Sequence, residues 1–95
     1  MLVSEEQLHN MEHALGIADY MLSKRSKYHR YGKCYIKSYR NYFCAGQRDL
    51  DSWRDLVDKG LATTWNNFNS TYFNVSDKGI EYLQEVQNYI IKFRD

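Results

Sequence analysis

A cationic segment rich in tyrosine is the part of the sequence best suited to bind another molecule. Residues 20–48 contain eight Lys or Arg residues and no Asp or Glu, and tyrosines alternate with these cations over residues 24–40. Lys and Arg attract phosphate groups, and tyrosine rings stack on bases, so the mixture is typical of nucleic-acid binding. The predicted nucleic-acid-binding residues are Lys24, Arg25, Lys27, Arg30, Lys33, Lys37 and Arg40.

The same segment also has a purely structural interpretation. Residues 1–19 contain four acids and no Lys or Arg, and residues 49–95 contain eight acids and five Lys or Arg residues. The cations could pair with these carboxylates or solvate a loop, while the tyrosines pack inward. For any single tyrosine we favour the inward position, and for the cationic cluster both interpretations stay open.

A short motif in the N-terminal region matches a zinc-peptidase signature. Residues 9–13 read His-Asn-Met-Glu-His, which fits H-x-x-E-H. A peptidase also needs a third ligand and a large cleft, and the chain offers only unanchored candidates such as Glu81 or Glu85. Cys34 and Cys44 lack the paired spacing of a structural zinc site. With no phosphate loop, dinucleotide fingerprint or serine-nucleophile elbow, we predict no metal, no cofactor and no enzymatic activity.

Length and composition predict a single domain over residues 1–95. Hydrophobic residues make up 43% and charged residues 26%, which is the range of folded domains. Two cysteines are too few for the disulfide framework of a secreted mini-protein, so both are expected to be free thiols. No apolar stretch approaches the roughly 18 residues of a membrane span, and the start lacks the pattern of a signal peptide. We therefore expect a cytoplasmic protein.

Helical periodicity predicts the first element that must position these residues. Ser4 and Gln7 have the spacing of a capping box, and apolar residues then recur at helical intervals, which predicts a helix over residues 4–15. Gly16 is expected to end or bend it. Whether residues 17–23 add another helical turn stays open.

The rest of the chain predicts a strand, a helix, a hairpin and a final helix. Residues 33–44 favour a short strand or an irregular aromatic segment, and residues 49–60 predict a helix. Two β-prone runs, residues 61–65 and 71–75, flank an Asn-rich turn over residues 66–70 and predict a hairpin. The last helix is expected to begin at Ser76 or Asp77 and to reach almost to the C-terminus, with Ile80, Leu83, Val86, Ile90 and Phe93 on one face.

Two aromatic residues of the predicted hairpin are candidates for contact with a partner. Trp65 and Phe68 lie near its turn, where large rings have little core to join. Trp53, by contrast, lies on the apolar face of its predicted helix and is expected in the core. The predicted partner-binding residues are therefore Trp65 and Phe68.

Two stretches that flank the hairpin resemble winged helix-turn-helix domains. Residues 56–61 fit the pattern L-V-x-x-G-L that closes the recognition helix, and residues 75–83 fit the pattern V-[ST]-x-x-G-x-x-[YF]-L that opens the helix after the wing. The resemblance implies an α+β winged-helix-like fold with an N-terminal helix, a central helix, a β-hairpin wing and a C-terminal helix. Residues 13–16 and 39–43 are also similar to short phage and prophage proteins of uncharacterised role.

The central helix departs from the winged-helix pattern in its charge. It carries Asp49, Asp51, Asp55 and Asp58 against Arg54 and Lys59. An acidic helix is a poor binder of the DNA major groove, so any DNA contact is expected in the cationic segment. We therefore predict a non-enzymatic, phage-derived protein that binds nucleic acid through that segment. The alternative is a protein-interaction module that uses the wing aromatics and the C-terminal helix, with another protein or a second copy as partner.

Overall fold

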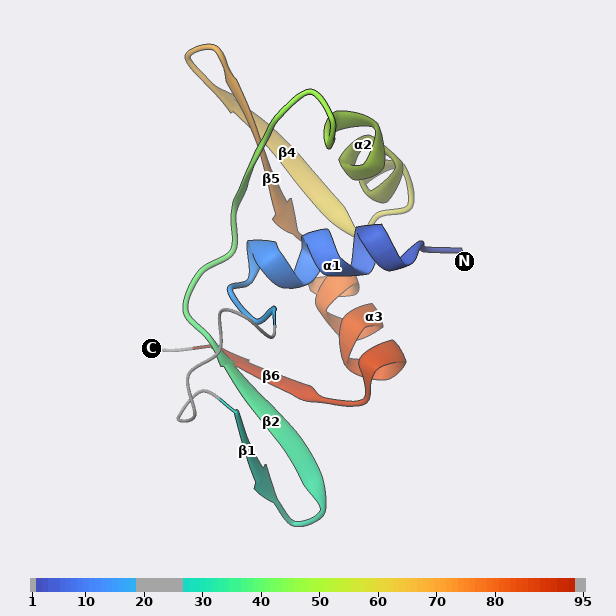
Figure 1. The fold of residues 1–95 in the computed structure, drawn as a ribbon, viewed down its shortest axis with the longest axis vertical. Coiled ribbons are helices and arrows are strands. Elements are labelled where there is room, and N and C mark those ends of the chain that lie inside the picture. Colours follow the sequence, from blue (N-terminus) through green and yellow to red (C-terminus); the bar gives the residue numbers. More distant parts are fainter. Residues whose placement is uncertain (1, 19–26, 94–95) are drawn as a thin grey trace.

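The chain folds into helices and strands of the predicted α+β class (Figure 1). The computed structural model describes residues 2–18 and 27–93, which contain three helices and six strands in two three-stranded sheets. The elements are α1 (Glu5–Ala14), β1 (Lys27–Arg30), β2 (Lys33–Ser38), β3 (Phe43–Ala45), α2 (Leu50–Asp58), β4 (Ala62–Asn67), β5 (Ser70–Val75), α3 (Asp77–Gln87) and β6 (Ile90–Phe93).

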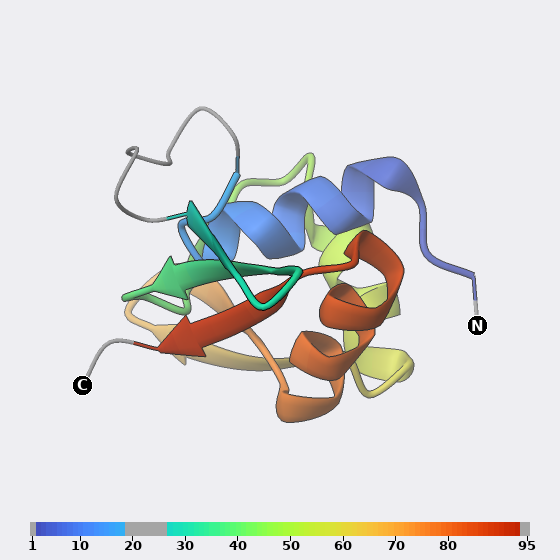
Figure 2. The same cartoon turned by 90° about the horizontal axis from the view of Figure 1, so that it is seen from below.

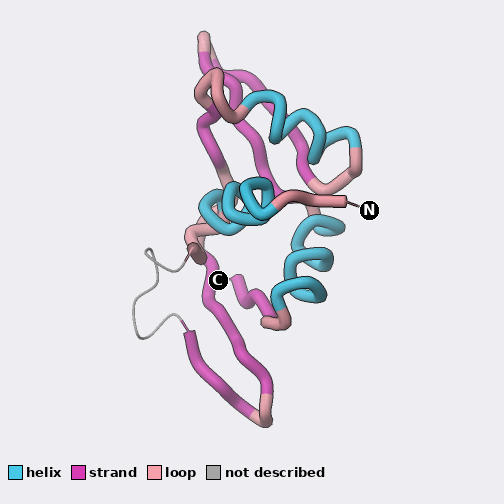
Figure 3. Tube along the Cα trace, turned by 45° about the vertical axis from the view of Figure 1, so that its right-hand side comes forward, coloured by secondary structure: helices cyan, strands magenta, loops and turns pink. Residues whose placement is uncertain are grey.

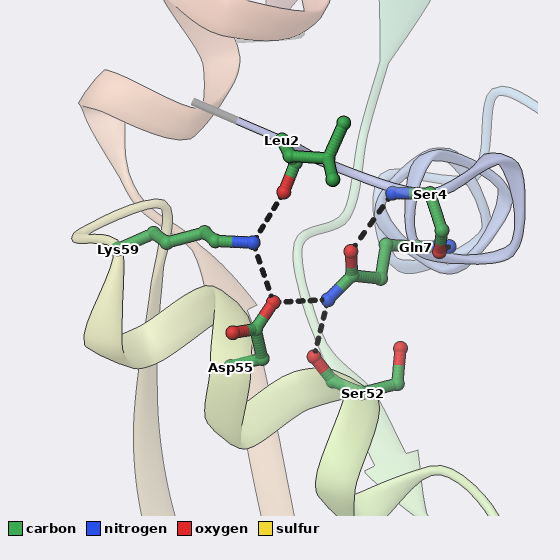
Figure 4. Close-up of polar contacts among 6 residues, drawn as sticks. All are labelled: Leu2, Ser4, Gln7, Ser52, Asp55 and Lys59. Carbon is green, nitrogen blue, oxygen red and sulfur yellow. Dashed lines mark hydrogen bonds and ion pairs between the residues drawn. The ribbon is translucent and has the colours of Figure 1, made fainter.

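The predicted capping box starts α1 and also joins α1 to α2. The Gln7 backbone N–H donates to the Ser4 hydroxyl over 3.1 Å, and the Ser4 N–H donates to the Gln7 side chain over 2.9 Å. The Gln7 amide then donates to the Ser52 carbonyl over 3.0 Å and to the Asp55 carboxylate over 2.8 Å. Lys59 completes this network by donating to Asp55 over 2.7 Å and to the Leu2 carbonyl (Figure 4).

The structure gives a role to the glycine in each of the two stretches that flank the hairpin, residues 56–61 and 75–83. Gly60 has a φ of 77°, and the N–H groups of Gly60 and Leu61 bond back to α2 carbonyls, which is how a left-handed residue ends a helix. Gly79 lies so close to the hairpin that an added Cβ would stand 2.1 Å from the Leu61 carbonyl oxygen. A glycine at each position therefore lets α2, the hairpin and α3 pack together.

The predicted hairpin forms, with longer strands and a tighter turn than expected. Residues 61–65 and 71–75 were expected to flank a turn over residues 66–70, yet β4 and β5 pair as far as Asn67 and Ser70. The turn is therefore only Phe68-Asn69. Strand β5 also pairs with β3, giving the antiparallel order β3-β5-β4.

The predicted C-terminal helix is wrong at its end. Helix α3 stops at Gln87, because Asn88 takes a left-handed conformation with a φ of 57°. The chain then forms β6, which runs parallel to β2 (Figure 2). The β-branched pair Ile90-Ile91 suits a strand, and the Gln84 side chain accepts the Ile91 N–H over 2.9 Å.

Strands β1, β2 and β6 form the second sheet, at the other end of the molecule from the β4–β5 hairpin (Figures 1 and 3). Ile36 of β2 and Ile91 of β6 are paired in register and are 2% and 6% exposed. Both belong to the same core as Trp53 and Phe73. The burial of Trp53 confirms the expectation from the sequence. The longest dimension of the molecule, 43 Å, follows the direction in which the two hairpins project.

Candidate functional site

One side of the β1-β2-β6 sheet gathers cations and tyrosines. Residues paired across neighbouring strands point to the same side of a sheet, as do residues two apart along one strand. The opposite side carries Ile36 and Ile91 and packs on the core. The remaining side, which we call the basic face, carries Tyr28, Arg30, Lys33, Tyr35, Lys37 and Lys92.

The residues of the basic face form three rows, and each row is a pair of residues in register on neighbouring strands. Arg30 pairs with Lys33 next to the turn, Tyr28 pairs with Tyr35 in the middle, and Lys37 pairs with Lys92. Two residues along a strand advance by about 6.6 Å, so the rows are spaced by about that distance. Two cation pairs therefore flank one tyrosine pair.

The side chains of the basic face contact one another. The rings of Tyr28 and Tyr35 stack with centroids 5.3 Å apart and planes 10° apart. The Lys37 ammonium lies 5.7 Å from the Tyr28 ring centroid, and the Lys92 ammonium lies 5.9 Å from that of Tyr35. These cation–π contacts hold positive charge beside aromatic rings, an arrangement that can contact phosphates and bases together.

The positive charge of the basic face is not neutralised by the described residues. Strands β1, β2 and β6 contain no Asp or Glu. No carboxylate within residues 2–18 and 27–93 lies at ion-pair distance from the cations of the face. Their side chains are exposed. The alternative in which these cations pair with acids elsewhere is therefore not what the described part of the chain shows.

The predicted nucleic-acid-binding residues divide into four groups. Arg30, Lys33 and Lys37 lie on the basic face, whereas Lys27 pairs with buried Ile36 and points to the other side. Lys24 and Arg25 lie outside the described residues. The fourth group is Arg40, which follows the end of β2.

Arg40, the seventh predicted residue, stabilises the fold. Its Nε donates to the Ala14 carbonyl at the end of α1 over 3.3 Å, and its Nη2 donates to the Tyr42 carbonyl over 3.3 Å. The guanidinium also lies 4.6 Å from the centroid of the Tyr42 ring. The Ala14 carbonyl at the end of α1 thus accepts bonds from both the Arg40 guanidinium and the Tyr42 N–H.

Lys92 belongs to the basic face, although no local pattern of residues indicated this position. It was placed in the predicted C-terminal helix, and only the parallel pairing of β6 with β2 brings it beside Lys37. A pairing between strands more than 50 residues apart leaves no local periodicity to read.

The underside of the β1–β2 hairpin has a different character. A cavity of about 570 Å³ lies between the hairpin and α3. Its lining includes the cross-strand neighbours His29 and Cys34, Lys33 of the basic face, and Glu81 and Glu85 of α3. The carboxylates of α3 thus border the underside of the hairpin. The strands of the sheet carry no acid of their own, and the carboxylates of α3 border a cavity that Lys33 of the basic face also lines.

The β4–β5 hairpin offers aromatic rings without charge. Residues 62–75 contain no charged side chain. Trp65 is 43% exposed, stacks on Tyr72 with centroids 4.4 Å apart, and donates from its indole N–H to Asn74 over 2.5 Å. Phe68, at the turn, is 98% exposed. Both predicted partner-binding residues are thus accessible on one uncharged ribbon.

The residues of the zinc-peptidase motif take part in helix packing. Glu12 accepts the Tyr89 hydroxyl over 2.9 Å, and the His13 ring meets the Phe43 ring edge-on at 5.2 Å. Burial, with help from nearby Arg40 and His9, lowers the pKa of His13 below its usual value. Among the residues that the structure describes, no three His, Cys, Asp or Glu side chains are grouped closely enough to hold a metal ion.

Neither a membrane-spanning helix nor a similar known protein adds to these observations on the described residues. None of the helices in the described ranges has the length and apolar character needed to cross a membrane. No protein-family model, curated protein or solved structure was found to match the chain.

Proposed function

We propose that this protein is a non-enzymatic, cytoplasmic, nucleic-acid-binding protein that contacts phosphates through the basic face. The observation that carries the proposal is the gathering of four exposed cations around two stacked tyrosines, on strands that contain no carboxylate. Phosphate neutralisation by Lys and Arg supplies most of the non-specific affinity for nucleic acids. Such a face attracts an anionic polymer and repels most basic proteins.

The proposal includes a winged-helix-like arrangement that does not read DNA with its central helix. The β4–β5 hairpin, preceded by α2 and followed by α3, has the element order that the resemblance implies. A helix-turn-helix has two helices in direct succession, whereas β3 and a turn directly precede α2. Helix α2 is also acidic, and Asp55 is held by Lys59 and Gln7. The basic face replaces the recognition helix in this proposal.

Charge reversal tests the proposal. Fluorescence anisotropy with a labelled oligonucleotide, titrated over a range of salt, gives the affinity and its salt dependence. Lys33→Glu with Lys37→Glu is expected to weaken binding by more than about tenfold. For a single strand, losing two phosphate contacts also lowers the slope of log affinity against log salt by about 1.4.

A matched control has the same change in net charge at another place. Arg48→Glu with Arg54→Glu alters two exposed cations on and before α2 and is expected to leave the affinity close to that of the wild type. Equal losses in the two double variants would show that only net charge matters. No binding of the wild type to single-stranded or duplex probes at low salt would overturn the proposal.

A second candidate function rests on the exposed rings of the uncharged hairpin. Trp65 and Phe68 are exposed at 43% and 98%, and a protein partner could cover them without having to offset any charge. Apolar docking of this kind is nearly insensitive to salt, whereas phosphate binding weakens steeply as salt rises. Size measurement by light scattering at low and moderate salt tests for self-association: a second copy as partner predicts a dimer at both salts, which Trp65→Ala with Phe68→Ala abolishes.

A further inference from the structure

We propose that Tyr31, at the turn of the β1–β2 hairpin, stacks on an unpaired base and makes the protein prefer single-stranded nucleic acid to duplex. The inference rests on the proposed function and names the class of ligand that the basic face binds. It concerns a residue that lies next to the cation pair Arg30 and Lys33, at the end of the ribbon.

The turn holds Tyr31 in a conformation that its side chain disfavours. Tyr31 has a φ of 52° and Gly32 a φ of 75°, so both central residues of the two-residue turn are left-handed. That geometry is a type I′ turn, for which Asn-Gly is the preferred pair. A Cβ-bearing aromatic residue is unfavourable there, because its Cβ crowds the following carbonyl oxygen.

Nothing in the described structure offsets this unfavourable conformation. The Tyr31 side chain is 89% exposed, so the ring buries almost none of its apolar surface. The neighbouring Arg30 guanidinium lies 5.8 Å from the ring centroid, and such an exposed cation–π contact contributes little. A strained residue without a packing role indicates a function outside the folded chain.

The position of the ring indicates what it contacts. A strand whose phosphates lie along the rows of the basic face would pass the Arg30–Lys33 pair and reach Tyr31 at the turn. In a duplex, the faces of the bases are covered by neighbouring bases, whereas an unpaired base presents its π-face. Stacking on Tyr31 is therefore open to a single strand and closed to an intact duplex.

The β4–β5 hairpin supplies a matched control for the turn. Phe68 also has a positive φ, 56°, and is 98% exposed, yet its ribbon carries no cation to hold a phosphate. Tyr31→Asn and Phe68→Asn each replace an aromatic residue by one that tolerates the left-handed conformation. Both variants are expected to raise the thermal midpoint by a few degrees.

Binding measurements separate the two turns. The probes are a labelled single strand of DNA, a single strand of RNA, and a DNA duplex of the same sequence. Tyr31→Asn is expected to weaken binding to the single strands by about tenfold while changing neither duplex binding nor the salt slope, because every cation is retained. Tyr31→Phe keeps the ring and should bind as the wild type does, and Phe68→Asn should also bind as the wild type does.

The outcomes distinguish this inference from the proposed function. If the wild type binds and Tyr31→Asn keeps the same preference between single strand and duplex, the stacking role is wrong and the basic face stands. A lowered thermal midpoint in Tyr31→Asn would show that the ring packs within the protein, which also overturns the stacking role. Failure of the wild type to bind any probe removes both proposals, as does binding to phosphatidylserine vesicles in place of the oligonucleotides.

Discussion

The β1–β2 and β4–β5 hairpins share a design and differ in charge and in attachment. Each is a two-stranded ribbon closed by a two-residue turn, with an exposed aromatic residue at positive φ. Residues 27–38 contain four Lys or Arg residues and no acid, whereas residues 62–75 contain no charge at all. The two turns differ in backbone geometry, because both central residues have positive φ in the β1–β2 turn and only Phe68 does in the β4–β5 turn. The larger differences between the ribbons are in charge and in what anchors each to the core.

The anchors differ in where they come from along the chain. Strand β5 supplies Phe73, 1% exposed, whose ring stacks on Trp53 with centroids 5.4 Å apart. Asn41 adds two bonds to the backbone of Val75, one donated and one accepted. Strand β2 is instead held by β6, which joins the sheet from the other end of the chain. The cations are thus found on the ribbon that contributes less to the central core.

The largest effect is expected where the uncharged hairpin enters the core. Phe73→Ala removes the ring that stacks on Trp53 and is expected to lower the free energy of unfolding by about 3 to 5 kcal/mol. That is a large part of the 5 to 15 kcal/mol typical of a domain, so both hairpins should lose structure together. Urea denaturation followed by circular dichroism measures the change. A loss below about 1 kcal/mol would contradict the assignment of Phe73 to the shared core.

A smaller and more local effect is expected at the anchor of the basic hairpin. Ile91→Ala, at a position that is 6% exposed, should cost about 2 to 4 kcal/mol. Because β6 directly holds β2, amide hydrogen exchange should accelerate more in β1 and β2 than in β4 and β5.

An exposed position on α3 provides the control for this variant. Val86→Ala, at 47% exposure, is expected to change the free energy of unfolding by no more than about 0.5 kcal/mol. Equal acceleration of exchange in both hairpins of Ile91→Ala would show that the two ribbons are not anchored separately.

Local signals in the sequence predicted the elements whose ends are set by their own residues. The pairing of Ser4 with Gln7 begins α1, Gly60 follows α2, and the Asn-rich run lies at the hairpin turn. The predicted end of the last helix was wrong, because Ile90 and Phe93 continue the apolar spacing of a helix. Short apolar runs fit a strand equally well. Residues 90–93 form a strand because they pair with β2, which lies more than 50 residues earlier in the chain.

The sequence predicted a group of cations, but it did not predict on which side of the β1-β2-β6 sheet each cation lies. Tyr35 and Lys37 alternate with Ile36 along the sequence, and Ile36 is the buried residue of the three. The register of β1 with β2 was not visible, because Tyr31-Gly32 lacks the Asn-Gly signal of a tight turn. Without that register, Lys27 could not be separated from Arg30, and Lys92 could not be added.

The smallest expected effect concerns the junction between the two sheets, where His13 meets Phe43 of β3. Burial is the main cause of the lowered pKa of His13, and Arg40, which lies between β2 and β3, adds to it. Below the usual histidine pKa of 6.5 the unfolded chain therefore binds more protons than the folded chain, so stability falls as pH falls through that region. Hydrogen bonds from Lys59 and Gln7 lower the pKa of Asp55 below its usual 3.8, so the contribution of Asp55 to stability is lost only at more acid pH.

Thermal midpoints of the wild type should therefore decrease between neutral pH and about pH 5, and those of His13→Gln should decrease less. Parallel pH profiles for the two proteins would show that His13 does not contribute to the pH dependence of stability.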